Sequence, residues 1–184
     1  MAAIITEKFR QHNADQFFES FSEASANNYY LFIGKTSPFT TGTTGGSDTT
    51  PPTPVDTVTL DNYKWDSMIA AKRIGTTDVT FVIPRRNYAN GTTYDMYEHN
   101  ISSSNPTDSG ASNLFDSTYY FITDEYKVYK VLDNNGGTAI AAGATGPTST
   151  NSDPFFEGGY YLQYMYTLST SQIQKFVTTD FIPV

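Results

Sequence analysis

The sequence predicts an α+β fold, with an antiparallel β-sheet or β-sandwich core, flanking helices and long polar loops. Three features of the composition indicate this class. Aromatic residues make up 15% of the 184 residues, charged residues make up only 16%, and Thr, Ser, Asn and Gly are abundant. Aromatic and β-branched residues favour short strands, and small polar residues favour loops, whereas a helical bundle would need more Ala, Leu, Glu and Lys.

Two segments in the first half of the chain carry helical signals. Apolar residues at helical spacing predict an amphipathic helix over residues 4–25. A second helix is predicted over residues 61–75, beginning at an aspartate cap and ending at a glycine. Its residues Trp65, Met68 and Ile69 are expected to pack on the sheet, so that replacing Trp65 with alanine would cost roughly 3–5 kcal/mol.

The C-terminal region combines a capped helix with an apolar end. Ser169 lies three residues before Gln172, which is the spacing of a capping box, and this predicts a short helix. The extended segment DFIPV follows at residues 180–184. An apolar end of this kind predicts either that residues follow Val184 in the native protein or that a partner covers this end.

Strands are predicted where aromatic and β-branched residues cluster between turn signals. The clearest is a hairpin of residues 119–123 and 126–132, with Asp124 and Glu125 at its turn. Residues 29–34 form a strand that is apolar on both faces and is therefore expected to be covered on both. Further strands are predicted at residues 79–84, 91–98 and 160–167.

The domain organisation follows from length and from two low-complexity stretches. A chain of 184 residues is expected to form a single domain over residues 1–184, which is long enough to bury about 70% of its unfolded surface. The stretches at residues 40–56 and 134–158 are rich in Gly, Thr, Ser and Pro, and are predicted to be loops.

Charge and cysteine content exclude several classes of function. The formal net charge is −8, from 11 basic and 19 acidic residues, so a nucleic-acid partner is not expected. There is no cysteine, which removes disulfides, thiolate nucleophiles and cysteine-type zinc sites. The sequence lacks the apolar stretch of a signal peptide or a membrane span, which predicts synthesis in a cytoplasm and no membrane partner.

No motif in the sequence indicates catalysis. Gly34-Lys35-Thr36 resembles the end of a phosphate-binding loop, but bulky residues precede it and Pro38 disfavours the helix that must follow. His12 and His99 each lack a nearby histidine or cysteine in the sequence, so neither predicts a metal site, and both are expected to be solvated. No G-x-S-x-G elbow is present. We therefore predict a protein that is not an enzyme, with no catalytic residue, cofactor, metal or small-molecule substrate.

Candidate interface residues are the remaining functional signal. Arg85 and Arg86 directly follow a predicted strand, and guanidinium groups pair well with carboxylates of a partner subunit. Phe39 and Phe155 lie beside the predicted loops, where an exposed ring suggests contact with a partner. The ordinary alternative for the arginines is a solvated loop, because exposed ion pairs contribute little.

Several segments, taken in order, resemble one protein family from about Ile5 to Val184. The series looks like the baseplate wedge subunit encoded by gene eight of T4-type contractile-tailed phages, especially versions from phages of cyanobacteria. These segments are ITEKFR, YYLFIGK, PPTPVD, WDSMIAAKRI, VTFVIPRRNY, GTTYDMYE, YYFITDEYKVYKVLDNN, YLQYMYTLS and KFVTTDFIPV.

The resemblance implies a structural role. The chain would be a wedge subunit of the virion tail baseplate, made and assembled in the host cytoplasm, which dimerises and contacts other baseplate wedge proteins. It would contribute to baseplate assembly and to the triggering of sheath contraction. Family members are longer, so the resemblance is to their N-terminal portion. The alternative from the residues alone is a carbohydrate-binding or receptor-recognition module of a tail fibre, because tyrosine-rich β proteins also stack on sugars.

Overall fold

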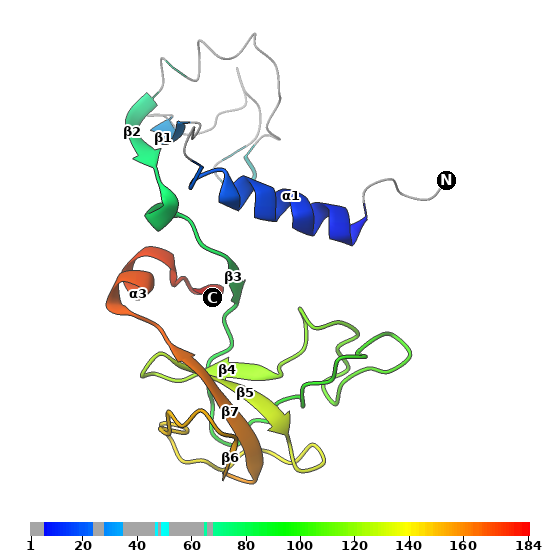
Figure 1. Cartoon of the computed structure of the whole chain (residues 1–184). Coiled ribbons are helices and arrows are strands. Elements are labelled where there is room, and N and C mark those ends of the chain that lie inside the picture. The colour runs from blue at the N-terminus through cyan, green and yellow to red at the C-terminus, as the bar shows by residue number, and fades with distance from the viewer. Residues whose placement is uncertain (1–5, 24–27, 35–46, 48, 52–64, 66–67) are drawn as a thin grey trace. The chain divides into compact units, whose positions relative to one another are not determined.

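The computed structural model describes residues 6–23, 28–34, 47, 49–51, 65 and 68–184 (Figure 1). The chain divides into two compact units, Met1–Val79 and Thr80–Val184. Its described elements are two α-helices, one 3-10 helix and strands that pair in antiparallel sheets, which confirms the predicted α+β class with a β-sheet core.

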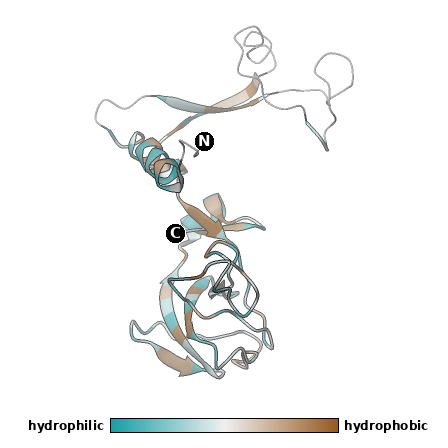
Figure 2. Ribbon diagram, turned by 90° about the vertical axis from the view of Figure 1, so that its right-hand side faces the viewer, coloured by the Kyte–Doolittle hydropathy of each residue, from teal (hydrophilic) through white to brown (hydrophobic). Residues whose placement is uncertain are grey.

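The first unit contains the N-terminal helix α1, Glu7–Glu19. Thr6 caps it, because the Thr6 hydroxyl oxygen accepts a hydrogen bond from the Phe9 N–H at 3.3 Å. The hydropathy colouring shows α1 as mostly hydrophilic with scattered hydrophobic positions (Figure 2). The helix is attached to the following strand through aromatic rings: Phe21 and Tyr29 lie 4.6 Å apart between ring centroids. The helix predicted over residues 4–25 is thus confirmed at Glu7–Glu19, whereas the described residues 20–23 lie beyond its end.

Strand β1, Tyr29–Gly34, pairs antiparallel with β2, Met68–Ile74. The strand at 29–34 was predicted correctly, but its coverage was not. The side chains of Tyr30 and Ile33, which point to opposite faces of the strand, are 62% and 64% exposed, so this chain leaves both faces of β1 largely uncovered within the described residues.

The predicted helix at residues 61–75 is wrong for residues 68–74, which form the strand β2, Met68–Ile74, whereas Trp65 has helical backbone. The sequence Met-Ile-Ala-Ala-Lys has good helical propensity, but antiparallel pairing with β1 overrides this local preference. Trp65 is 67% exposed rather than packed in a core. Because little of the ring is buried, Trp65→Ala should cost far less than 3–5 kcal/mol. Residues 61–64, 66 and 67 lie outside the described residues.

The second unit is built on a four-stranded antiparallel sheet in the order β4-β5-β7-β6. The predicted hairpin is present as β4 and β5, and the strand predicted at residues 160–167 is β7. The bounds are Tyr120–Ile122 for β4, Lys127–Asp133 for β5, Phe155–Glu157 for β6 and Tyr160–Thr167 for β7.

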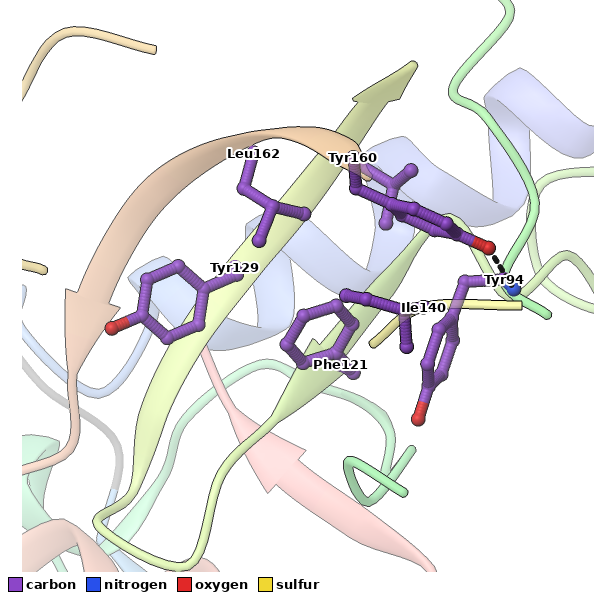
Figure 3. Close-up of a cluster of buried hydrophobic side chains, with 7 residues drawn as sticks. Tyr94, Phe121, Tyr129, Ile140, Tyr160 and Leu162 are labelled. Atoms are coloured by element: carbon purple, nitrogen blue, oxygen red, sulfur yellow. Dashed lines mark hydrogen bonds between the residues drawn. The ribbon is translucent and has the colours of Figure 1, made fainter. Parts of the chain in front are cut away.

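This sheet carries a hydrophobic cluster on each face, because successive side chains of a strand point to opposite sides. Phe121 and its cross-strand partner Tyr129 belong to the first cluster, whose labelled side chains gather on one face of the paired strands (Figure 3). Tyr120 and Ile122 belong to the second cluster. The buried members of the first are Tyr94, Phe121, Tyr129, Val131, Ile140, Tyr160 and Leu162; those of the second are Tyr120, Ile122, Val128, Leu168 and Ile182.

The second face is covered by the C-terminal elements. Helix α3, Thr170–Phe176, has the predicted capping box: the Ser169 oxygen accepts from the Gln172 N–H, and the Gln172 side chain accepts from the Ser169 N–H. Strand β8, Phe181–Pro183, pairs with β3, Val82–Pro84. The segment DFIPV thus finds a partner strand within this chain.

Residues 91–98 do not form the predicted strand; they run as irregular backbone. Local hydrogen bonds replace a strand ladder there. Asp95 is 1% exposed, and its carboxylate accepts four hydrogen bonds. The donors are the N–H groups of Ser109 and Thr118 at 2.8 Å each, and the hydroxyls of Ser109 at 2.7 Å and Ser117 at 3.0 Å. The Asp95 carboxylate thus joins residues 109, 117 and 118 and holds the long loop before β4 in place.

Gly158, in the tight turn between β6 and β7, has φ +61°, and an added Cβ would lie 2.6 Å from the Ala142 backbone nitrogen. We expect Gly158→Ala to destabilise the protein by about 2 kcal/mol, because a backbone atom cannot move aside. Gly143, with φ +84° and open space around it, is the matched control and should lose only about 1 kcal/mol. Urea unfolding of both variants measures the difference; equal losses would refute the steric account.

Candidate interaction surface

The most exposed apolar feature of the first unit is the β1–β2 ribbon, which we define as β1, β2 and Trp65. Its large apolar side chains are exposed despite lying in or beside paired strands. They are Tyr30 at 62%, Leu31 at 61%, Phe32 at 45%, Ile33 at 64%, Trp65 at 67%, Met68 at 36% and Ile69 at 60%. Contiguous apolar surface of this kind marks protein interaction sites in soluble proteins.

One face of the ribbon holds an apolar pocket. Phe32 lies opposite Ala71 in the register, and Tyr30 lies opposite Arg73. The Trp65 ring stacks on the Phe32 ring, with centroids 6.3 Å apart and planes 15° apart. A pocket of about 240 Å³ is lined by Tyr30, Phe32, Trp65, Met68 and Ala71. The only charged group on this face of the paired strands is the Arg73 guanidinium.

The other face combines aliphatic side chains with one ion pair. Leu31 lies opposite Lys72, and Ile33 lies opposite Ala70. The Lys72 ammonium contacts the Asp78 carboxylate at 2.6 Å. Because the Lys72 side chain is 65% exposed, this ion pair contributes little stability. Both faces of the ribbon therefore present apolar side chains to their surroundings.

No described residue pairs with the outer strand edges of the ribbon. In the part of the chain that the structure describes, β1 pairs only with β2, and the sheet has two strands. Two-stranded sheets are marginally stable alone, and unpaired apolar edges favour pairing with another chain. A partner that covers the ribbon would bury apolar side chains and could satisfy the free backbone groups together.

Arg85 and Arg86 are partly buried and are engaged within the chain. The Arg85 guanidinium donates to the Thr178 carbonyl oxygen at 3.0 Å. The Arg86 guanidinium donates to the carbonyl oxygens of Phe115 and Asp116 at 2.8 and 2.9 Å. Arg86 Nε is buried and has no hydrogen-bond partner among the described residues. The structure gives both arginines a role inside the second unit, and their contact with a partner stays a prediction.

Phe155, the predicted aromatic contact in the second unit, is partly buried. Its ring packs edge-on against Tyr129, with centroids 6.0 Å apart. The neighbouring Phe156 is 63% exposed and contacts Tyr161. Phe39 lies outside the described residues. Sequence reasoning missed most of the ribbon; its signal was the strand at residues 29–34, which is apolar at every position before Gly34.

The titratable groups with shifted pKa values lie mostly in the core. Burial, together with the Glu157 carboxylate, raises the pKa of Tyr129 to about 12, and burial raises the pKa of Tyr166 to about 12. These phenols are therefore neutral at ordinary pH. Burial also lowers the pKa of Lys130, whose ammonium lies 3.3 Å from the centre of the Tyr97 ring.

No group of three or more His, Asp or Glu residues among those described lies close enough together to hold a metal ion. None of the described helices has the length and apolar character needed to cross a membrane. The prominent surface feature of the first unit is thus the apolar ribbon.

Comparison with known proteins identifies the family. No curated protein matches the chain. The model of the family described as "Bacteriophage T4, Gp8" matches residues 3–153, which includes the ribbon and the hairpin of β4 and β5. This match covers most of the 184 residues. The chain therefore belongs to the Bacteriophage T4, Gp8 family and is a structural protein of the phage tail baseplate.

Proposed function

We propose that this chain is a baseplate wedge subunit that contributes to baseplate assembly and to the triggering of sheath contraction. It dimerises, and it contacts other wedge proteins. The observation that carries the proposal is the exposed apolar β1–β2 ribbon, in a chain whose family is a structural component of the baseplate.

The ribbon supports this function because its exposure is costly for an isolated subunit. Leaving apolar surface in water forgoes about 25 cal/mol for each Å² that a partner could bury. Trp65 and Phe32 also present flat rings beside a pocket, and aromatic side chains are enriched at the centre of interfaces. The ribbon is therefore a better candidate contact than Arg85 and Arg86, whose hydrogen-bonding groups are largely used within the chain.

Replacing Phe32 and Trp65 together with alanine is expected to impair incorporation into wedges while leaving the isolated chain folded. The two rings stack on each other, so their loss should lower the free energy of unfolding by no more than about 1.5 kcal/mol. Wedge assembly is followed by co-sedimentation of the variant with the other baseplate proteins, and folding by urea unfolding.

Phe156→Ala is the control, because it removes a ring of similar exposure (63%) from the second unit. We expect this variant to assemble like the parent. Normal incorporation of the Phe32 and Trp65 double variant would contradict the role of the ribbon. Retention of the parent chain on host-surface glycans, with no affinity for any baseplate protein, would instead favour the receptor-recognition alternative.

A further inference from the structure

The chain contains two Asn-Gly pairs, Asn90-Gly91 and Asn135-Gly136. Asparagine before glycine is prone to deamidation, because no Cβ on the glycine hinders its backbone nitrogen from attacking the asparagine side-chain carbon. The attack forms a C–N bond and expels ammonia, which leaves a cyclic succinimide. Solvent water then opens this ring to aspartate or to isoaspartate, so no oxidant, metal or cofactor is needed.

The first pair is held by the core. The Gly91 N–H, which would have to attack, donates a hydrogen bond to the Ile140 carbonyl oxygen at 2.9 Å. The Ile140 N–H returns a hydrogen bond to the Thr92 carbonyl oxygen at 3.0 Å. Ile140 is 0% exposed and belongs to the first hydrophobic cluster. The peptide group between Asn90 and Gly91 therefore cannot turn towards the Asn90 side chain without breaking a bond to the core.

The second pair lies in an exposed turn directly after β5. Asn135, Gly136 and Gly137 have φ values of 52°, 67° and 77°, three consecutive left-handed residues. Asn135 and Gly136 are exposed. The Gly136 N–H has no hydrogen bond to any residue that the structure describes. The carbonyl of the same peptide group accepts only the Thr138 hydroxyl, at 2.9 Å and at the surface.

We propose that Asn135 is the site at which this protein deamidates spontaneously in its folded state, whereas Asn90 is protected. The Gly136 nitrogen, which attacks the Asn135 side chain, makes no hydrogen bond to the core. The turn is exposed, so water can reach the succinimide and complete the reaction.

Deamidation at Asn135 would alter the turn after β5, beside a residue that holds this turn to the loop before β4. The preceding residue, Asn134, is 3% exposed, and its side-chain amide donates to the Tyr94 carbonyl oxygen at 3.0 Å and to Asp108 at 2.6 Å. Isoaspartate would insert one more carbon into the backbone beside this anchor. The new carboxylate would also lie near Asp133, whose oxygen accepts the Asn135 N–H at 2.7 Å. The product is therefore expected to melt at a lower temperature than the parent.

The test is incubation of the folded full chain at mildly alkaline pH, followed by peptide mass spectrometry and enzymatic methylation of isoaspartate. We expect conversion at Asn135 to be about tenfold faster than at Asn90, because the Gly91 hydrogen bond must first break; tenfold corresponds to about 1.4 kcal/mol. In concentrated urea the two sites should react at similar rates. Equal rates in the folded chain, or faster conversion at Asn90, would overturn the proposal.

Asn135→Gln is the matched variant, because glutamine cannot form the five-membered ring readily. The folded variant should lose the product at position 135 and keep the slow rate at Asn90. A persistent mass increase in the peptide that contains position 135 would place the reaction at the neighbouring Asn134 instead and would contradict the assignment.

Discussion

Replacing Phe121 with alanine is expected to lower the free energy of unfolding of the second unit by about 3–5 kcal/mol. Phe121 is 0% exposed and lies at the centre of the first hydrophobic cluster. Its ring centroid is 4.8 Å from that of Tyr94, 5.2 Å from that of Tyr88 and 5.9 Å from that of Tyr129. The substitution removes apolar burial and leaves a cavity between the rings of Tyr88, Tyr94 and Tyr129, which cannot all collapse into it.

Urea unfolding monitored by tyrosine fluorescence measures this loss. Phe115→Ala is the matched control, because Phe115 is 65% exposed and its loss should change stability by no more than about 0.5 kcal/mol. A Phe121→Ala variant as stable as the Phe115→Ala variant would show that the cluster around β4 and β5 is not the core of the second unit.

Replacing Asp95 with asparagine is expected to lower the free energy of unfolding by about 3 kcal/mol. Hydrogen bonds to a buried charged group are strong, and the asparagine NH₂ group would face donors where the carboxylate has an accepting oxygen. Burial alone would raise the pKa of Asp95. The hydrogen bonds from the N–H of Thr118 and from the N–H and hydroxyl of Ser109 outweigh burial, with the Ser117 hydroxyl adding to them, so the pKa of Asp95 lies below its ordinary value.

The pH dependence follows from this shift. Because the pKa of Asp95 is lower in the folded state, its contribution to stability is fully present above the unfolded pKa, about 4. That contribution is lost as the pH falls through the folded pKa. The parent should therefore lose stability in acid more steeply than Asp95→Asn, whereas Asp124→Asn, at an exposed turn position, should follow the parent. Parallel stability curves for the parent and Asp95→Asn would contradict the role of the carboxylate.

The elements that the sequence predicted well are those whose local signals and tertiary contacts agree. Helix α3 carries its own cap in Ser169 and Gln172, and the β4–β5 hairpin has a turn between two aromatic strands. Residues 68–74 show the opposite case. Their composition favours a helix, and only pairing with β1, more than thirty residues earlier in the sequence, makes them a strand.

The candidate site was harder to predict than the fold. Arginines and loop aromatics are ordinary interface residues, but whether a guanidinium is free depends on distant carbonyl groups such as those of Phe115 and Thr178. The exposure of Trp65 could not be read from its sequence neighbours, because a single tryptophan at helical spacing is more often buried. Asp95 likewise lies in a segment with a strand-like sequence, and its role depends on Ser109, Ser117 and Thr118, which come later in the chain.

The central claim is that the β1–β2 ribbon is a contact surface in the assembled baseplate. A density map of the intact phage tail, at a resolution that shows side chains, tests it most directly. We expect Phe32 and Trp65 to be covered by another protein chain, with their pocket filled by its apolar side chains. A map in which both faces of the ribbon are exposed to solvent, in a fully assembled baseplate, would contradict it.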